Sequence, residues 1–186
     1  WVMEQAVKQA GLWRQAGREL VVAVNVSALQ FRHPDFVSRL EQLLSTHNLP
    51  ARYLELEVTE SLTMGDPQAA IATMQQLRTL GVSLAIDDFG TGYSSMNYLR
   101  RLGFNKVKID QSFVRDIGAD PDDEVIISAI IQLGQSLGMV TLAEGVESAT
   151  QRDFLATRGC QLMQGWLVSP ACPLEDFEAF LNTAPR

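Results

Sequence analysis

The sequence has 186 residues, and its 15 Lys or Arg residues against 22 Asp or Glu residues give a formal net charge of −7. Its composition, 46% hydrophobic and 20% charged, is typical of a globular chain and excludes a disordered, collagen-like or coiled-coil protein. We expect one domain over residues 1–186. The acidic balance also excludes a general binder of DNA or RNA polymers, because such proteins displace counterions with clusters of Lys and Arg.

Helical and extended patterns alternate along the chain. In chain order they predict a helix at about 2–13, strand Leu20–Val26, helix 35–47, strand Tyr53–Thr59, helix 67–80, strand Val82–Asp87, helix 95–102, strand Lys106–Ile109, helix 121–137, strand Met139–Ala143, helix 148–158, strand Leu162–Met163 and helix 174–182. This alternation favours parallel strands with helices outside them, in an open sheet or a barrel.

Two features bear on the cellular location. Residues 125–143 carry no charge, yet they include several polar residues, and Gly138 separates a helix pattern from a strand pattern. We therefore expect no membrane contact by this domain and no signal peptide. The cysteines Cys160 and Cys172 form no metal-binding spacing, which suits a reducing, cytoplasmic setting.

Polar residues recur at the carboxyl ends of the predicted strands. They are Asn25, Glu57, Asp87, Asp88, Lys108, Asp110, Glu144 and Gln164. Active sites of (β/α)₈ barrels lie at this end of the strands, and neither nucleotide-binding glycine signature is present, so we predict a barrel. A closed barrel needs eight strands and about 250 residues. Because the chain shows about six strands, we expect two more strands upstream of Trp1.

The carboxylates in this set predict a cation site. Glu57, Asp87, Asp88 and Glu144 would converge, with Asp110 one strand further round, and gathering such charges without a cation is costly. Oxygen ligands without His or Cys favour Mg²⁺, Mn²⁺ or Ca²⁺. Each acidic residue taken alone can instead be a helix cap or an ion-pair partner.

The pair Asp87 and Asp88 is the sharpest local signal. Neighbouring residues of a strand point to opposite faces, so both can reach one site only if the strand ends between them, with Gly90 and Gly92 making the turn. That geometry suits two metal ions about 3.5–4 Å apart. The alternative is an Asx-turn at the entry to a loop.

Lys108 is a candidate catalytic residue. Strand alternation places it on the same face as Lys106 and beside the carboxylates, with Lys106 nearer the barrel floor. An ammonium there can orient a hydroxide or pair with a phosphate. It can equally be a buried lysine that only compensates charge.

Several motifs resemble those of the EAL-domain cyclic di-GMP phosphodiesterases of bacteria, from Trp1 to about Phe180. The matching stretches are residues 24–27, 56–61, 87–95, 108–110, 143–147 and 164–166. The resemblance implies a modified TIM barrel that hydrolyses cyclic di-GMP to linear pGpG with two Mg²⁺ or Mn²⁺ ions.

The resemblance also implies roles for individual residues. By it, Asn25, Glu57, Asp87, Asp88 and Glu144 are metal ligands, Lys108 lies near the attacking water, Gln164 and Asp110 bind substrate, and Glu60 and Glu147 stabilise loops. Lys108, Glu144, Glu57 and Asp87 are then the catalytic set. The loop Phe89–Ser95 is expected to couple the site to a homodimer, and sensor or GGDEF domains are expected upstream, in a parent that can be membrane-anchored.

The sequence departs from the family at its start. The Glu-Ala-Leu segment of the first strand, with its metal-binding glutamate and nearby arginine, is missing, so we expect the 186 residues alone to be inactive and to bind metal weakly. Two other functions stay open. One is a catalytically silent receptor that binds cyclic di-GMP without turnover. The other is an enolase-like barrel in which Lys108 abstracts a proton from a Mg²⁺-bound carboxylate substrate.

Overall fold

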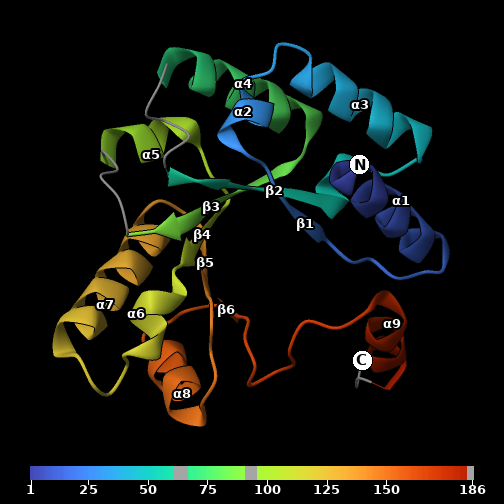
Figure 1. The fold of residues 1–186 in the computed structure, drawn as a ribbon. Coiled ribbons are helices and arrows are strands. Elements are labelled where there is room, and N and C mark those ends of the chain that lie inside the picture. The colour runs from blue at the N-terminus through green and yellow to red at the C-terminus, as the bar shows by residue number, and fades with distance from the viewer. Residues whose placement is uncertain (61–66, 91–95, 184–186) are drawn as a thin grey trace.

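The computed structural model describes residues 1–60, 67–90 and 96–183. Its strands form one parallel sheet in the order of the sequence. They are β1 (Val22–Asn25), β2 (Leu54–Thr59), β3 (Ser83–Phe89), β4 (Lys106–Ile109), β5 (Val140–Ala143) and β6 (Leu162–Met163). The sheet curls (Figure 1), and a strand order without reversal is that of a barrel wall rather than of a doubly wound sheet. The predicted six-stranded, incomplete barrel is confirmed.

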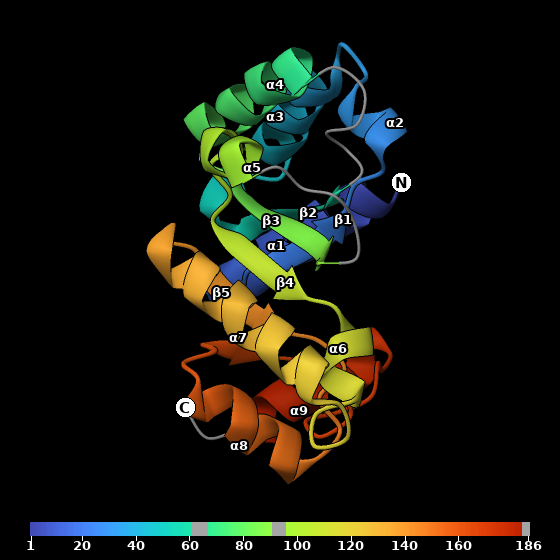
Figure 2. The ribbon, with the colours of Figure 1, turned by 90° about the vertical axis from the view of Figure 1, so that its left-hand side faces the viewer.

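Helices surround the outer side of the curled sheet. They are α1 (Val2–Gln15), α2 (Ala28–Phe31), α3 (Phe36–Thr46), the 3₁₀ helix η1 (Ala51–Tyr53), α4 (Pro67–Leu80), α5 (Met96–Leu102), α6 (Gln111–Arg115), α7 (Pro121–Ser136), α8 (Ala149–Thr157) and α9 (Leu174–Thr183). In Figures 1 and 2, α3, α4 and α5 gather at one end of the molecule and α6, α7 and α8 at the other.

The two faces of the sheet have opposite chemistry. On the outer face, Leu56, Leu84 and Ile109 are completely buried, and helices α4 and α7 cover this face with buried residues such as Met74 and Ile127. On the inner face the alternate positions of the same strands are charged or small, because successive residues of a strand point to opposite sides. The hydrophobic core therefore lies outside the sheet, and the inner face is left for polar chemistry.

Two short α-helices were missed by the sequence patterns. Helix α2 begins after Ser27, whose side chain accepts from the Gln30 backbone N–H, while the Gln30 side chain accepts from the Ser27 N–H. This capping box was the signal that could have predicted α2. Helix α6 begins after Asp110, which accepts from the Ser112 N–H at 2.9 Å. Both helices are too short for hydrophobic periodicity to show.

The first and last helices meet across the two edges of the sheet. Trp13 Nε1 donates to Glu178 at 2.8 Å, and the rings of Trp13 and Phe177 lie 5.5 Å apart. Strands β1 and β6 are at the two ends of the strand order, so the described strands do not close into a full barrel. The expectation of two further strands stays a prediction. None of the helices in the described part of the chain is long and apolar enough to cross a membrane.

Candidate active site on the inner face of the sheet

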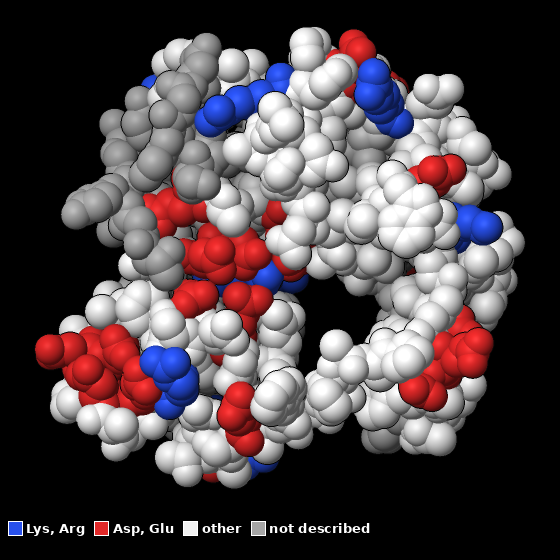
Figure 3. Space-filling model, in the orientation of Figure 1, with Lys and Arg blue, Asp and Glu red and all other residues white. Residues whose placement is uncertain are grey.

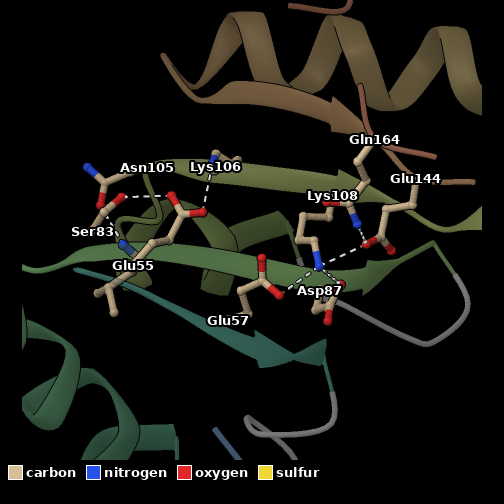
Figure 4. Close-up of polar contacts among 10 residues, drawn as sticks. Glu55, Glu57, Ser83, Asp87, Asn105, Lys106, Lys108, Glu144 and Gln164 are labelled. Atoms are coloured by element: carbon tan, nitrogen blue, oxygen red, sulfur yellow. Dashed lines mark hydrogen bonds and ion pairs between the residues drawn. The ribbon is translucent and has the colours of Figure 1, made fainter. Parts of the chain in front are cut away.

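Lys108 stands at the centre of a cluster of three carboxylates (Figure 4). Its Nζ lies 2.8 Å from Glu57 Oε2, 2.8 Å from Asp87 Oδ1 and 2.9 Å from Glu144 Oε1. These residues come from β4, β2, β3 and the end of β5, and only 3% of Lys108 is exposed. The structure thus brings together the four residues predicted as the catalytic set.

The local sequence explains how Lys108 reaches across the sheet. Lys108 lies on β4 and Glu57 on β2, with β3 between them. The β3 residue in register with Glu57 is Ala85, which is completely buried and too small to block the lysine. A larger side chain at that position would fill the space that Lys108 crosses.

Asp87 and Asp88 lie near the same site, but the backbone geometry that brings them together differs from the one predicted from the sequence. β3 does not end between Asp87 and Asp88 but continues to Phe89. Its register with β4 shifts between Ile86 and Phe89, and Asp88 has φ 52, so a β-bulge places one extra residue there. The expectation that the strand ends between the aspartates was therefore wrong. The bulge, rather than a turn at Gly90, re-aims the Asp88 side chain.

Three carboxylates lie close enough to hold one ion. Asp87, Asp88 and Glu144 each offer an oxygen, and these oxygens lie within 4.8 Å of one another. Figure 3 shows acidic side chains gathered at the middle of this face of the molecule. Carboxylate oxygens are the donors that Mg²⁺ and Mn²⁺ bind, so the residues present fit such ions.

The pKa shifts follow from this crowding. Burial acts to lower the pKa of Lys108, but hydrogen bonds to Asp87, Glu57 and Glu144 outweigh it and raise that pKa above its ordinary value. Burial raises the pKa of Glu144, and the neighbouring Lys108 opposes that rise. Burial and then the negative charge of Asp87 raise the pKa of Asp88, as do the charge and a hydrogen bond of Asp110. The carboxylates therefore hold more negative charge than one ammonium balances, which favours a further cation.

Gln164 joins the site from the loop after β6. Its Nε2 donates to Glu144 Oε1 at 2.6 Å. The loop is held by the backbone of Val146, whose N–H donates to Gln164 O at 3.0 Å and whose carbonyl accepts from Leu167 N–H at 2.9 Å. Gly165 makes this approach possible, because a Cβ there would lie 2.3 Å from backbone atoms of Val146. The predicted Gln164 is thus placed beside the carboxylates.

The other predicted residues lie around this centre. Asn25 is in register with Glu57, and so shares the inner face. Asp110 caps α6 and also contacts Asp88. Glu60 is buried and directly follows β2. The backbone N–H of Glu147 donates to Gln151 Oε1. Their assigned roles stay predictions.

Part of one prediction lies outside the described residues. The loop expected to couple the site to a dimer spans residues 89–95, of which 91–95 are not described.

Two features of the site region were missed. Glu55 pairs with Lys106, on the amino-terminal side of the Lys108 cluster. Glu55 and Glu57 are two residues apart on one strand, and this spacing was the signal that both side chains share the inner face. Gln151 is buried and its Nε2 donates to Val114 O, which ties α8 to α6. Its position after Ser148 matches a capping box, which was the available signal.

Comparisons with known proteins agree on one family. A family model described as the EAL domain matches residues 1–171. The chain is 43% identical over 180 residues to the bifunctional diguanylate cyclase/cyclic di-GMP phosphodiesterase MucR of Pseudomonas aeruginosa, covering 96% of this chain and 26% of MucR. It is 44% identical over 183 residues to the cyclic di-GMP phosphodiesterase NbdA of the same organism, covering 98% of this chain and 23% of NbdA.

Solved structures have the same fold. The PaMucR phosphodiesterase in a cyclic di-GMP complex matches with a TM-score of 0.92 and 43% identity, over 95% of this chain and 72% of that chain. The EAL domain of Mycobacterium smegmatis DcpA matches with a TM-score of 0.93 and 35% identity, over 100% of this chain and 85% of that chain. The chain spans only about a quarter of the length of the curated relatives, 26% of MucR and 23% of NbdA.

Proposed function

The chain belongs to the EAL-domain family, and we propose that it forms the site of a metal-dependent cyclic di-GMP phosphodiesterase. The observation that carries the proposal is the cluster of Lys108 with Glu57, Asp87 and Glu144, completed by Asp88 within ion-binding distance. The names of the relatives MucR and NbdA supply the substrate. The reaction adds water across one P–O3′ bond of the cyclic dinucleotide and releases linear pGpG.

Asn25, Glu57, Asp87, Asp88 and Glu144 would hold Mg²⁺ or Mn²⁺. When bound, two such ions supply charge neutralisation for the phosphate and activation of the attacking water. We assign Mg²⁺ or Mn²⁺ because every donor in the set is an oxygen.

The chain's own residues position the reacting groups and balance their charge. Lys108 contributes a positive charge fixed by three carboxylates, and this charge acts on the phosphate electrostatically, because its three N–H donors already have carboxylate partners. Gln164 holds Glu144 through its amide N–H and leaves its amide oxygen for other partners. Asp110, at the start of α6, is proposed to bind substrate, and Glu60 and Glu147 to hold neighbouring loops.

The test is a cyclic di-GMP hydrolysis assay on the full natural protein, with Mg²⁺ or Mn²⁺ and product separation by chromatography. We expect pGpG to form, and the variant Asp87→Ala to lose at least about 10³ in kcat. Asp153→Asn is the matched control, because Asp153 is an exposed acidic residue of α8. Near-normal turnover by Asp87→Ala would overturn the two-metal assignment. Binding of cyclic di-GMP without hydrolysis by the unmodified protein would identify a receptor instead.

Further expectations belong to this proposal. We propose that the domain works in the cytoplasm as a homodimer, linked to sensor or GGDEF domains, and light scattering of the purified protein measures the oligomeric state. The 186 residues alone are expected to be inactive. Turnover equal to that of the full natural protein would contradict that prediction.

A further inference from the structure

A second ion pair, with a buried glutamate and a partly buried lysine, lies toward the amino-terminal ends of the strands from the Lys108 cluster, to its left in Figure 4. Lys106 Nζ is 2.6 Å from Glu55 Oε1, and Ser83 Oγ donates to Glu55 Oε2 at 3.1 Å. Glu55 is 4% exposed. The proposed reaction uses none of these three residues, so the charges of Glu55 and Lys106 require another explanation.

The strand register gives Lys106 two carboxylates within reach. Ala85 of β3 is in register with Glu57 on one side and with Lys106 on the other, so Glu57 is level with Lys106. Two strand spacings, about 9.6 Å in all, separate those backbones, which a lysine and a glutamate side chain span together. Glu55 is in register with Ser83 and therefore lies one step lower. Lys106 nevertheless pairs with the lower glutamate.

Two contacts determine that choice. Ser83 occupies the second oxygen of Glu55 and fixes the carboxylate toward Lys106. Lys108 Nζ already pairs with Glu57 Oε2 at 2.8 Å. The Lys106 side chain is only 16% exposed, so an ammonium that loses its carboxylate there is poorly solvated and favours another acidic partner. Without Glu55, Glu57 is a carboxylate at the same strand level that Lys106 can turn to.

We propose that Glu55 is a positioning residue that holds Lys106 away from Glu57 and so keeps the second carboxylate oxygen of Glu57, the one that Lys108 does not contact, available to a divalent cation. The inference rests on the proposed function in one respect, the role of Glu57 as a metal ligand. A second ammonium on Glu57 would compete with the cation for the same oxygens and would add positive charge beside it. Glu55 thereby acts on the metal site through Lys106 rather than by touching metal or substrate.

The test is a titration of the full natural protein with Mn²⁺, followed by calorimetry, for Glu55→Gln alone and combined with Lys106→Met. We expect Glu55→Gln to weaken Mn²⁺ binding by roughly 10–100-fold, the range found when partners of metal ligands are removed. The double variant, which has no lysine to redirect, should recover binding to within a few-fold of the unmodified protein. The comparison is made among variants shown to be folded by circular dichroism, because removing both partners of the ion pair would also restore stability.

Activity provides a second readout. In Glu55→Gln the Mn²⁺ concentration for half-maximal hydrolysis should rise, while kcat at saturating Mn²⁺ stays within a few-fold. Glu41→Gln is the matched control, because it removes the same charge from an exposed position of α3. It should leave Mn²⁺ affinity unchanged.

The outcomes separate the inference from the proposed function. Absence of Mn²⁺ binding by the unmodified protein would overturn the proposed function. Normal Mn²⁺ binding by both the unmodified protein and folded Glu55→Gln would overturn the inference alone, and so would a loss that Lys106→Met does not reverse. If Glu55→Gln does not fold, Glu55→Asp retracts the carboxylate from Lys106 and carries the same test, again with reversal by Lys106→Met.

Discussion

Lys108 Nζ lies 2.8 Å from Asp87 Oδ1, so the ammonium contacts a carboxylate that is also a candidate metal ligand. The lysine bridges three acidic side chains. It therefore stabilises the folded chain, and it also becomes the cation with which any bound metal must share these ligands.

Replacing Lys108 tests this dual role. In metal-free buffer, Lys108→Met should lower the free energy of unfolding by about 3–5 kcal/mol, the usual cost of removing one partner of a buried ion pair. Saturating Mg²⁺ should restore part of that loss, because the ion replaces the missing positive charge. Urea unfolding with and without Mg²⁺ measures both effects, with Lys8→Met on exposed α1 as the control. Equal stability of the two variants would show that the cluster contributes nothing to folding.

The Asp88 side chain is expected to lower the stability of the metal-free chain and to contribute to metal binding. Asp88 adopts a left-handed φ of 52, and the negative charges of Asp87 and Asp110 lie close by. Asp88→Gly should therefore raise the stability of the metal-free chain by about 1 kcal/mol, because glycine takes this conformation without strain. The same variant should bind Mn²⁺ more weakly. Thermal unfolding and Mn²⁺ titration check the two effects, and lower stability in metal-free buffer would contradict the explanation.

Gly165 should be intolerant of any side chain. Its φ is 152, and an added Cβ would lie 2.3 Å from the backbone of Val146. Gly165→Ala should force the loop away, separate Gln164 from Glu144 and raise KM for cyclic di-GMP. Gly118→Ala is the matched control, because Gly118 also has a positive φ but no atom within 4 Å of an added Cβ. The control should lose about 1–2 kcal/mol of stability from strain and keep its KM. Equal KM values for the two variants would show that the loop contact does not position substrate.

The two cysteines should differ in reactivity. Cys160 is 7% exposed and burial raises the pKa of its thiol, whereas Cys172 is exposed. The thiolate is the reactive form, so a raised pKa and burial both slow alkylation. Iodoacetamide at about pH 8, near the ordinary thiol pKa, should label only Cys172 in the folded protein and both cysteines after unfolding. Mass spectrometry of Cys172→Ser, which should stay unlabelled when folded, is the control. Rapid labelling of Cys160 in that variant would contradict the buried position.

The sequence by itself determined the order of the strands and longer helices, the face of most strand positions and the acidic residues around Lys108. Alternation with period two suffices to place Glu57 and Lys108 on the inner face, because it depends only on the geometry of one strand. Capping residues likewise fix helix starts such as that at Asp120, whose side chain accepts from the Asp122 N–H.

Only the tertiary structure decided how these groups meet. The bulge at Asp88 depends on the register between β3 and β4, which no local pattern specifies. The choice of Lys106 for Glu55 over Glu57 depends on which strands are neighbours and on the small Ala85 between them. Contacts between strands distant in sequence depend on backbone pairing and on competition among charges for the same partners, and these exist only once the sheet has formed.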